Sequence, residues 1–398
     1  VTGCATAGPA GVATAPTVLD APGVPEVPDT DVADAERVAK RAITFNKDDK
    51  DANITYGQVL ANEQKYDEAR TQFEVAAKLD PKDARPIVLE AGTYVRQNAM
   101  ALAGQVYDRA LSVDPNNQEA LAGKATLLAN EHNVKDAFAT YEKLLALQNS
   151  DLDKASVVDQ EAHMYAVEKM SGEADAAYKR AINDYPKVPN AHLQYGDYLA
   201  FSKDMAGAER EWTTAAGPNR DYPEALARLG EYYASKNQLP KAVDYYKRLT
   251  EVANQDPKAF LLLGQAYGVN KQYDKARDAF KQSYSLSHTP ESLFGLAQAD
   301  YQSRNYRECA DIYSTVDRNA PQLTKQNPQL LFLLGQCYQK GGDSRRARDA
   351  YARFLPYLKP GSQAQKQVQQ IIADIDRSGK PKPAAKPSPK STQTSQKK

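Results

Sequence analysis

Residues 53–79 read NITYGQVLANEQKYDEARTQFEVAAKL and contain the pattern on which the fold depends. Gly57 is followed twelve residues later by Ala69, and Phe73 comes four residues after that. Ala69, Phe73 and Ala76 are spaced i, i+4 and i+7, which places them on one face of a helix. The apolar residues around Gly57 follow the same spacing. The stretch therefore predicts a pair of helices joined by a turn.

The same three residue types recur along the chain with a period of about 34. The small position holds Gly57, Ala91, Ala125, Ala162, Gly196, Gly230, Gly264, Ala297 and Gly335. The alanine position holds Ala69, Ala103, Ala137, Ala174, Ala208, Ala242, Ala276, Cys309 and Ala347. The ring position is aromatic in every copy: Phe73, Tyr107, Tyr141, Tyr178, Trp212, Tyr246, Phe280, Tyr313 and Tyr351. The step changes to 37 before Ala174, 33 before Cys309 and 38 before Ala347, and we expect these changes to fall in loops between units.

A small residue in each helix allows the two backbones to approach closely, and the aromatic ring fills the space one turn along. Proline residues stand where helices are expected to end or begin, because proline cannot continue a helix but suits its first turn. These are Pro81, Pro115, Pro186, Pro257 and Pro321. The pattern predicts an all-α array in which each unit packs on its neighbours.

This pattern resembles the tetratricopeptide repeat over residues 51–360, and its Leu-Gly-x-x-Tyr form begins at Leu229, Leu263 and Leu334. The resemblance implies a right-handed superhelical solenoid of about nine helix-turn-helix repeats, with a concave face lined by first helices. Asp31–Phe45 resembles a lone half-repeat, in which Ala35, Ala39 and Ala42 keep the phase of a second helix. Gln363–Arg377 is expected to cap the last apolar face, which repeat arrays need for solubility.

The ends of the chain differ in composition from its body. Residues 1–36 carry six acids and no Lys or Arg, and residues 378–398 carry six Lys and no acid. We expect a disordered Pro- and Ala-rich tether at 1–30 and a disordered Lys- and Pro-rich tail at 378–398. Between them we expect the solenoid at 31–360, with its half-repeat at 31–46, and the capping helix at 361–377.

Overall composition excludes several classes of protein. Lys plus Arg and Asp plus Glu are both 51, and this balance argues against a nucleic-acid-binding protein, which needs a basic surface. The sequence contains no run of 18 apolar residues and therefore predicts no membrane span. Three Cys and four His are too few for a disulfide scaffold or a multi-zinc protein.

The first residues, Val1-Thr2-Gly3-Cys4, resemble the lipobox of bacterial lipoproteins, in which the Cys is lipidated. A lipid on Cys4 would hold the protein on a membrane surface. The resemblance implies an extracytoplasmic location in the bacterial cell envelope, in the periplasm or at the outer membrane. The alternative is a Cys that stands in a linker by chance, with a cytoplasmic location.

The last three repeats carry an apolar strip with amides on the predicted concave face. The predicted partner-binding groove consists of Leu261, Gln265, Phe294, Gln298, Tyr301, Phe332, Gln336 and Gln339. Apolar anchors and amide groups suit an extended peptide or an amphipathic helix. In the alternative, some of these rings pack against the next repeat or the capping helix. Co-chaperone members of the family bind a carboxylate with cations, but the corresponding positions here are Ile54, Gln58, Val88, Gly92, Leu261 and Gln265, so that function is not carried over.

The sequence predicts no catalytic residue, cofactor or metal ion. Asp159 and His163 are spaced i, i+4 on one helix, and Asp197 is expected on the same face of the next unit. These three could hold a divalent metal, although an ordinary polar position is the preferred interpretation. His192 is predicted to be a core histidine.

The two remaining cysteines lie in adjacent units on facing helices. An exported protein could oxidise Cys309 and Cys337 to a disulfide. The simpler alternative is that Cys309 stands in for a buried alanine.

The sequence thus predicts a non-catalytic scaffold that binds a peptide or protein partner in its groove. We expect no nucleic acid, no small-molecule substrate and membrane contact only through the lipid anchor. Resemblance to bacterial tetratricopeptide lipoproteins favours an envelope assembly factor. The alternatives are a soluble cytoplasmic adaptor or assembly factor and, remotely, a metal-dependent enzyme.

Overall fold

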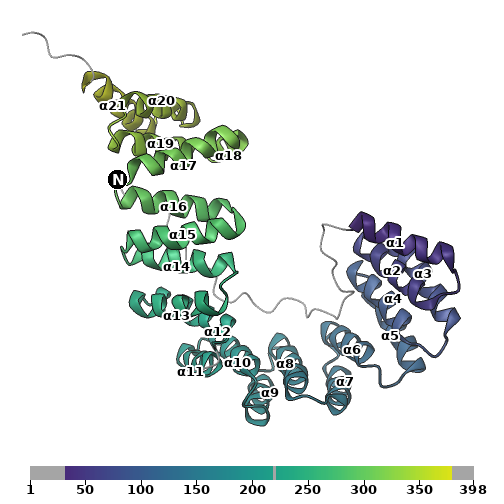
Figure 1. Cartoon of the computed structure of the whole chain (residues 1–398). Helices are drawn as coiled ribbons and strands as arrows, with labels where there is room; N and C mark the ends of the chain where they lie inside the picture. Colours follow the sequence, from purple (N-terminus) through teal and green to yellow (C-terminus); the bar gives the residue numbers. More distant parts are fainter. Residues whose placement is uncertain (1–31, 218–220, 379–398) are drawn as a thin grey trace, which may run out of the picture. The chain divides into compact units, whose positions relative to one another are not determined.

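The computed structural model describes residues 32–217 and 221–378, with side chains described for 37–217 and 221–377. Every regular element in these ranges is helical, which confirms the predicted all-α fold (Figure 1). The chain forms two compact units, Val1–Leu229 and Gly230–Lys398, and the division falls inside α12 (Pro223–Ser235). The expected tether with Cys4, and the expected tail from residue 379 onward, lie outside the described residues.

In the first unit, one helix is followed by pairs made of a first and a second helix. These helices are α1 (Val32–Phe45), α2 (Lys50–Asn62), α3 (Tyr66–Leu79), α4 (Arg85–Arg96), α5 (Met100–Val113), α6 (Gln118–Asn130), α7 (Val134–Leu147), α8 (Asp151–Val167), α9 (Ser171–Asp184), α10 (Pro189–Phe201) and α11 (Met205–Ala216). In α2–α11, helices with even numbers are first helices and the odd-numbered helices that follow them are second helices.

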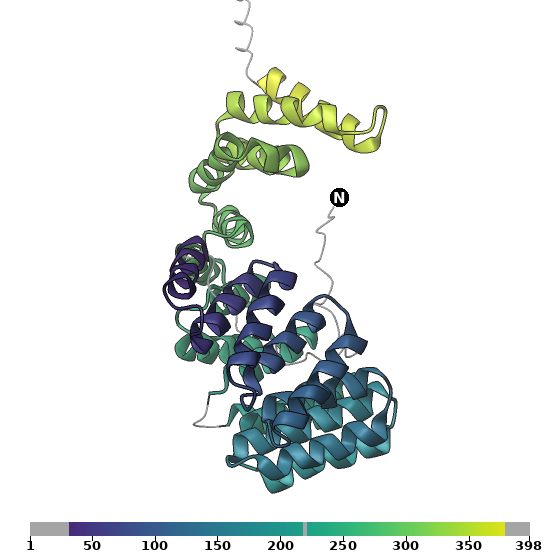
Figure 2. The same cartoon turned by 90° about the vertical axis from the view of Figure 1, so that its right-hand side faces the viewer.

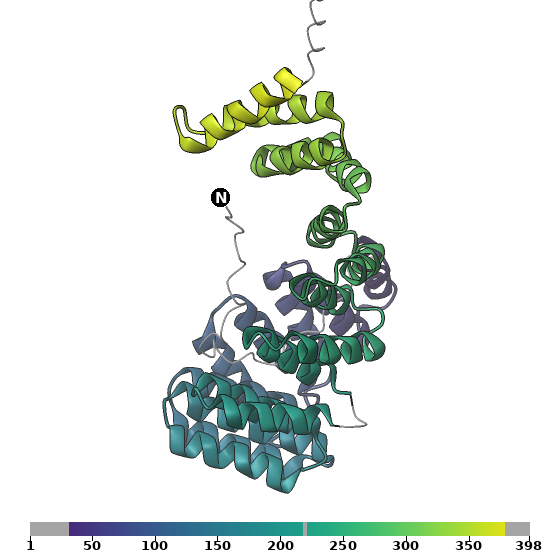
Figure 3. The same cartoon turned by 90° about the vertical axis from the view of Figure 1, so that its left-hand side faces the viewer.

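The second unit continues the pairs and ends in a capping helix. Its helices are α13 (Leu239–Val252), α14 (Pro257–Val269), α15 (Tyr273–Ser287), α16 (Pro290–Gln302), α17 (Tyr306–Asn319), α18 (Pro321–Gln326), α19 (Gln329–Lys340), α20 (Ser344–Phe354), the 3-10 helix η2 (Leu355–Tyr357) and α21 (Gln363–Ser378). The alternation of first and second helices continues to α17; after the additional helix α18, α19 is a first helix and α20 a second helix. Helix α21 lies beside α20 at the yellow-green end of the chain (Figures 2 and 3).

The three recurring positions form the core of both units. All nine side chains at the ring position are buried, with at most 6% of their surface exposed. All nine residues at the alanine position are 0% exposed. The residues at the small position are buried as well. The predicted pattern of helix contacts is therefore confirmed.

The ring of Phe280 shows why the first helices carry small residues. A Cβ atom on Gly264 of α14 would lie 2.7 Å from Phe280, and one on Gly295 of α16 would lie 2.6 Å from it. Carbon atoms do not approach so closely, so the ring occupies space that two side chains would need. Tyr107 is held against Gly123 of α6 in the same way. Each such ring joins its own repeat to the next one.

The turn between the two helices of a repeat has one backbone conformation throughout. The residue seven positions after the small position has a φ between 57° and 85° in all nine repeats: Gln64, Asn98, His132, Lys169, Lys203, Asn237, Lys271, Arg304 and Gly342. The next N–H then bonds to a carbonyl five residues earlier, as from Gln272 N to Tyr267 O at 2.9 Å. This is the Schellman motif, in which glycine is the preferred residue. Only the last of the nine turns has glycine at this position, Gly342.

At two of the three changes in repeat length, the additional residues form helix. The prediction that all three changes lie in loops is wrong for these two. Helix α8 has 17 residues, whereas the first helices α2, α6, α10, α14 and α16 have 13. The longer step before Ala347 contains α18, an additional helix of six residues. Additional residues at these points satisfy their backbone hydrogen bonds by forming helix.

The two terminal helices cover the ends of the apolar array. On α1, Ala39 is buried against Tyr56 and Leu60, but Ala42 is exposed, so the predicted second-helix phase holds only in part. No first helix precedes α1 among the described residues, and α1 therefore buries only the face that meets α2. On α21, Val368 and Ile375 are buried in a cluster around Tyr351 and Phe354 of α20.

The sulfur atoms of Cys309 on α17 and Cys337 on α19 are bonded to each other, with the two Cα atoms 5.9 Å apart. Both residues are buried, Cys309 at 0% and Cys337 at 1% exposure. Cys309 therefore fills the place of an alanine and also forms a cross-link. The disulfide joins the helices on either side of α18.

Two glycines of α14 provide a matched test of the packing. We expect Gly264→Ala to lower the free energy of unfolding by about 1–3 kcal/mol, because its Cβ would overlap Phe280. A Cβ on Gly268 meets nothing within 4 Å, so Gly268→Ala should be neutral or stabilise by up to about 1 kcal/mol. Thermal unfolding followed by circular dichroism measures both. Equal effects of the two substitutions would contradict this account of the packing.

The repeated turn predicts a stabilising substitution. Lys271 adopts a φ of 58°, which is unfavourable for a residue with a Cβ atom. Lys271→Gly should raise the free energy of unfolding by about 0.5–1 kcal/mol. Urea denaturation checks this, with Lys281→Gly in the interior of α15 as a control that should destabilise by about 1 kcal/mol. If both variants lose stability, the turn does not strain Lys271.

Candidate functional site

The residues of the predicted groove divide between the surface and the core of the second unit. Gln265, Gln298 and Gln339 are exposed, and Leu261, Phe294, Tyr301, Phe332 and Gln336 are partly exposed. The exposed amides remain available to a partner, apart from Gln339, which accepts a hydrogen bond from Tyr351 Oη at 2.9 Å.

Two of the predicted anchor rings pack on the core. The centroid of Phe294 lies 6.3 Å from that of Tyr313, and Phe332 lies 5.5 Å from Tyr351 and 5.6 Å from Phe354. Phe332 belongs to the cluster that also contains the apolar residues of α21. Both rings therefore pack against neighbouring elements over part of their surface, as in the alternative interpretation. Substituting these rings would affect folding as well as binding.

A cavity of about 300 Å³ lies between α14, α15 and α16 and brings two predicted groove residues together. Its lining residues are Gln265, Gly268, Val269, Tyr273, Ala276, Phe280, Gly295, Gln298, Ala299 and Gln302. The floor is apolar, and three glutamines stand around it. Val269 at the rim is 64% exposed, which is unusual for a large aliphatic side chain.

Gly268, Val269, Tyr273 and Gln302 also line the cavity but are not among the groove residues predicted from the sequence. A cavity of this kind arises from side chains that are absent, and a Cβ on Gly268 would meet only open space. The signal available in the sequence was the second glycine of α14, one helical turn after Gly264.

The candidate metal ligands do not form a site. Asp197 accepts a hydrogen bond from Trp212 Nε1 at 2.9 Å and pairs with Arg228 at 3.0 Å. Asp159 is only 7% exposed, and Asn190 donates a hydrogen bond to it at 3.3 Å. Within residues 37–217 and 221–377, no three His, Cys, Asp or Glu side chains are grouped so as to hold a metal ion.

Burial shifts the pKa values of Asp159 and His163 on α8. It raises the pKa of Asp159 to about 7 and lowers the pKa of His163 below its usual value. Both shifts follow from desolvation of the charged form. The shift of Asp159 disfavours its carboxylate form, which is the form that would bind a cation.

His192 is a core histidine, as predicted. It is 9% exposed, and its Nδ1 lies 2.8 Å from Glu211 Oε2 on the paired helix α11.

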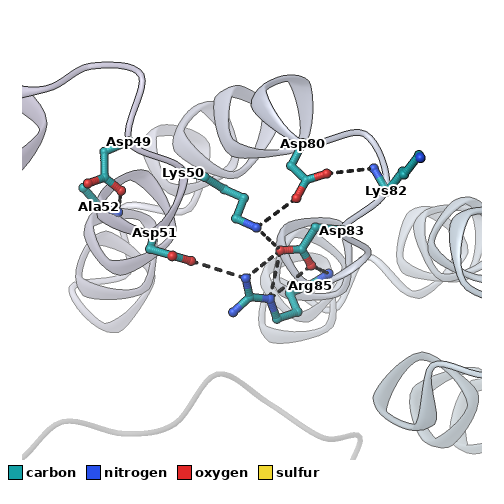
Figure 4. Close-up of polar contacts among 8 residues, drawn as sticks. All are labelled: Asp49, Lys50, Asp51, Ala52, Asp80, Lys82, Asp83 and Arg85. Carbon is teal, nitrogen blue, oxygen red and sulfur yellow. Dashed lines mark hydrogen bonds and ion pairs between the residues drawn. The ribbon is translucent and has the colours of Figure 1, made fainter.

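The charged cluster at the start of the first unit is paired within itself (Figure 4). Lys50 Nζ lies 3.0 Å from Asp80 and 2.8 Å from Asp83. Arg85 bonds to Asp83 at 2.6 Å and to Asp51 at 3.3 Å. The hydrogen bonds from Arg85, with smaller contributions from Lys50, hold the pKa of Asp83 well below its usual value. The cluster joins the start of α2 to the loop before α4, and these five charged side chains are paired with one another.

None of the helices in the described part of the chain is both long and apolar enough to cross a membrane.

Comparisons with known proteins agree with the repeat pattern. A family model described as tetratricopeptide repeat matches residues 30–84 and 227–289, and a second model of the same description matches 329–355. Among curated proteins, a probable UDP-N-acetylglucosamine–peptide N-acetylglucosaminyltransferase SPINDLY from Solanum lycopersicum is 32% identical over 98 residues. That match covers 25% of this chain and 10% of the relative.

Solved structures with related folds have low sequence identity. The C-terminal part of a TPR repeat-containing protein from Cytophaga hutchinsonii is 21% identical with a TM-score of 0.47, and the match covers 61% of this chain and 97% of that one. YrrB, described as a TPR protein with an unusual peptide-binding site, is 21% identical with a TM-score of 0.35, and the match covers 49% of this chain and 98% of that one. MamA is 17% identical with a TM-score of 0.38, covering 42% and 90%.

The matched models fall on helix pairs that carry the small, alanine and ring positions, and the remaining pairs repeat those positions with the same burial. The chain therefore contains tetratricopeptide repeats.

Proposed function

We propose that this protein is a non-catalytic scaffold that binds an extended peptide segment of a partner protein across the cavity of α14, α15 and α16. Tetratricopeptide repeat proteins bind peptides or proteins, and that general role applies to this chain. The choice of this cavity as the site is our proposal.

The observation that carries the proposal is the combination of an apolar floor with an amide rim. The cavity of about 300 Å³ can take one apolar side chain of a peptide, with Phe280 and Ala276 beneath it. Gln265, Gln298 and Gln302 each provide both a donor and an acceptor for peptide backbone groups. Apolar anchors provide binding energy, whereas amides fix the direction of an extended chain.

We further propose that the protein works at the extracytoplasmic face of a bacterial membrane as an envelope assembly factor. Two features support this. The start of the chain resembles a lipobox with Cys4 as the acceptor, and the Cys309–Cys337 disulfide belongs to an oxidising compartment. A soluble cytoplasmic adaptor with the same fold is the alternative.

The similarity to the SPINDLY transferase does not extend the proposal to catalysis. It spans 10% of that relative, and an activity of the whole relative is not carried by such a segment. Asp197, one of the three candidate metal ligands, is paired with Arg228. We therefore propose that the chain presents partners and does not transform them.

Filling the cavity should abolish peptide binding without unfolding the protein. Peptides selected on the full chain from a random phage-displayed library serve as the probe, and fluorescence anisotropy measures their affinity. Gly268→Leu places a side chain into open space and should weaken binding by at least about tenfold, which is about 1.4 kcal/mol. Gly268→Ala is the matched control and should retain most of the affinity.

Two results would count against the cavity. Selected peptides that bind Gly268→Leu as tightly as the natural chain would place the site elsewhere. Failure of the library to give any binder would contradict the peptide-binding function itself.

The location is tested separately in the bacterial host. The gene product expressed from its own start should incorporate labelled palmitate, and Cys4→Ser should prevent this and release the protein from the membrane fraction.

After acid trapping, Cys309 and Cys337 should react with a maleimide only once they are reduced. A protein that takes up no palmitate and has both thiols free would favour the cytoplasmic alternative.

A further inference from the structure

A second cavity, unrelated to the proposed peptide groove, lies beside α18. It has a volume of about 390 Å³ and is lined by Asp317, Pro321, Thr324, Lys325, Leu331, Arg353, Pro356 and Tyr357. These residues come from α17, α18, α19, α20 and η2, all within the second unit. Helix α18 is the additional helix that breaks the repeat period (Figure 1). The cavity is therefore a local departure from the repeat, with a size typical of small-ligand sites.

Thr324 lines this cavity and carries a hydroxyl without a hydrogen-bond partner. The residue is 4% exposed, and within the described part of the chain its Oγ1 is buried without a hydrogen-bond partner. Buried hydroxyls in proteins nearly always have a partner, so an exception calls for an explanation. A ligand in the cavity would provide one if the Thr324 side chain turned its buried Oγ1 toward it.

The charges around the cavity favour an anion. Arg353 and Asp317 form a two-point ion pair, with Nη1–Oδ2 at 2.6 Å and Nη2–Oδ1 at 2.8 Å. The pair neutralises itself and holds the guanidinium group in place. Lys325 is exposed, and no acidic partner for it is found among the described side chains. The lining therefore has a net charge of +1, which is the difference between two cations and one carboxylate.

The rest of the lining is apolar. Pro321, Leu331 and Pro356 form aliphatic walls, and the ring of Tyr357 is 48% exposed. A ring exposed at the mouth of a cavity can stack on a flat ligand. The site thus combines one ammonium group and one hydroxyl with a predominantly apolar surface.

We propose that this cavity binds a carboxylate carried on an apolar body. Lys325 Nζ and Thr324 Oγ1 donate hydrogen bonds to the carboxylate, while Tyr357 and the prolines contact the body. A free organic acid and the C-terminal residue of a peptide share this chemistry. The site is independent of the peptide groove, and either can exist without the other.

Isothermal titration calorimetry on the full chain with 3-phenylpropionate tests the class of ligand. Binding in the millimolar range or tighter is expected, whereas 3-phenylpropionamide lacks the charge and acetate lacks the body, and both should bind much more weakly. The peptides acetyl-Ala-Ala-Phe acid and its C-terminal amide distinguish the two sources of the carboxylate. Failure of both acids to bind, or equal binding of the amides, would overturn the proposal.

Two variants locate the site. Lys325→Gln should weaken 3-phenylpropionate binding by about five- to tenfold, because it removes a charge-assisted hydrogen bond. Lys281→Gln, on the surface of α15, is the control and should leave binding unchanged.

Thr324→Val separates a ligand-binding role from a structural role of the hydroxyl. It should weaken binding by a similar factor and leave the melting temperature of the ligand-free protein unchanged or raised, because it removes a buried hydroxyl without a partner. A lowered melting temperature with unchanged affinity would show that the hydroxyl serves the fold or holds only water, and would overturn the proposal.

Discussion

The contact between an aromatic ring and a residue without a large side chain packs the two helices of a repeat together, and at Phe280 and Tyr107 such a contact also reaches the next repeat. Phe280 takes the space that Cβ atoms on Gly264 and Gly295 would need, and it contacts two successive first helices at once. The same ring position is buried in every repeat. Because a repeat has no core of its own, the stability of each unit depends on these shared contacts. Dispersion and burial at one ring therefore stabilise two helix pairs together.

The proposed binding sites lie where this packing leaves space. In α14, Gly264 is filled by a ring, but Gly268 one turn later faces open space and forms part of the cavity. Around α18, four additional residues in the repeat period produce a helix, and three residues of that helix line a cavity. Regular repeats thus provide the scaffold, and departures from regularity provide the candidate sites.

Much of the fold could be predicted from the sequence because its determinants are periodic. The ring and alanine positions recur through nine repeats, and the helix pairs follow from them. The turn conformation could not be predicted, since Lys271 and Arg304 occupy a backbone region that glycine prefers. The predicted groove stays a prediction, and its residues lie in different surroundings. Gln265 and Gln298 line the cavity, but Phe332 packs mainly on Tyr351 and Phe354, because the capping helix encloses that end of the array. Thr324 could not be predicted as a site residue from the sequence, because only the structure shows that its buried hydroxyl has no hydrogen-bond partner.

A double-mutant cycle between Gly264 and Phe280 tests the central claim most directly. Urea denaturation gives the free energy of unfolding for the natural chain, Gly264→Ala, Phe280→Leu and the double variant. If the ring occupies the space of the missing Cβ, the alanine substitution should be costly beside Phe280 and neutral or favourable beside the smaller leucine side chain of the double variant. The coupling energy should then be about 1 kcal/mol or more. Additive effects, with a coupling energy near zero, would contradict the account.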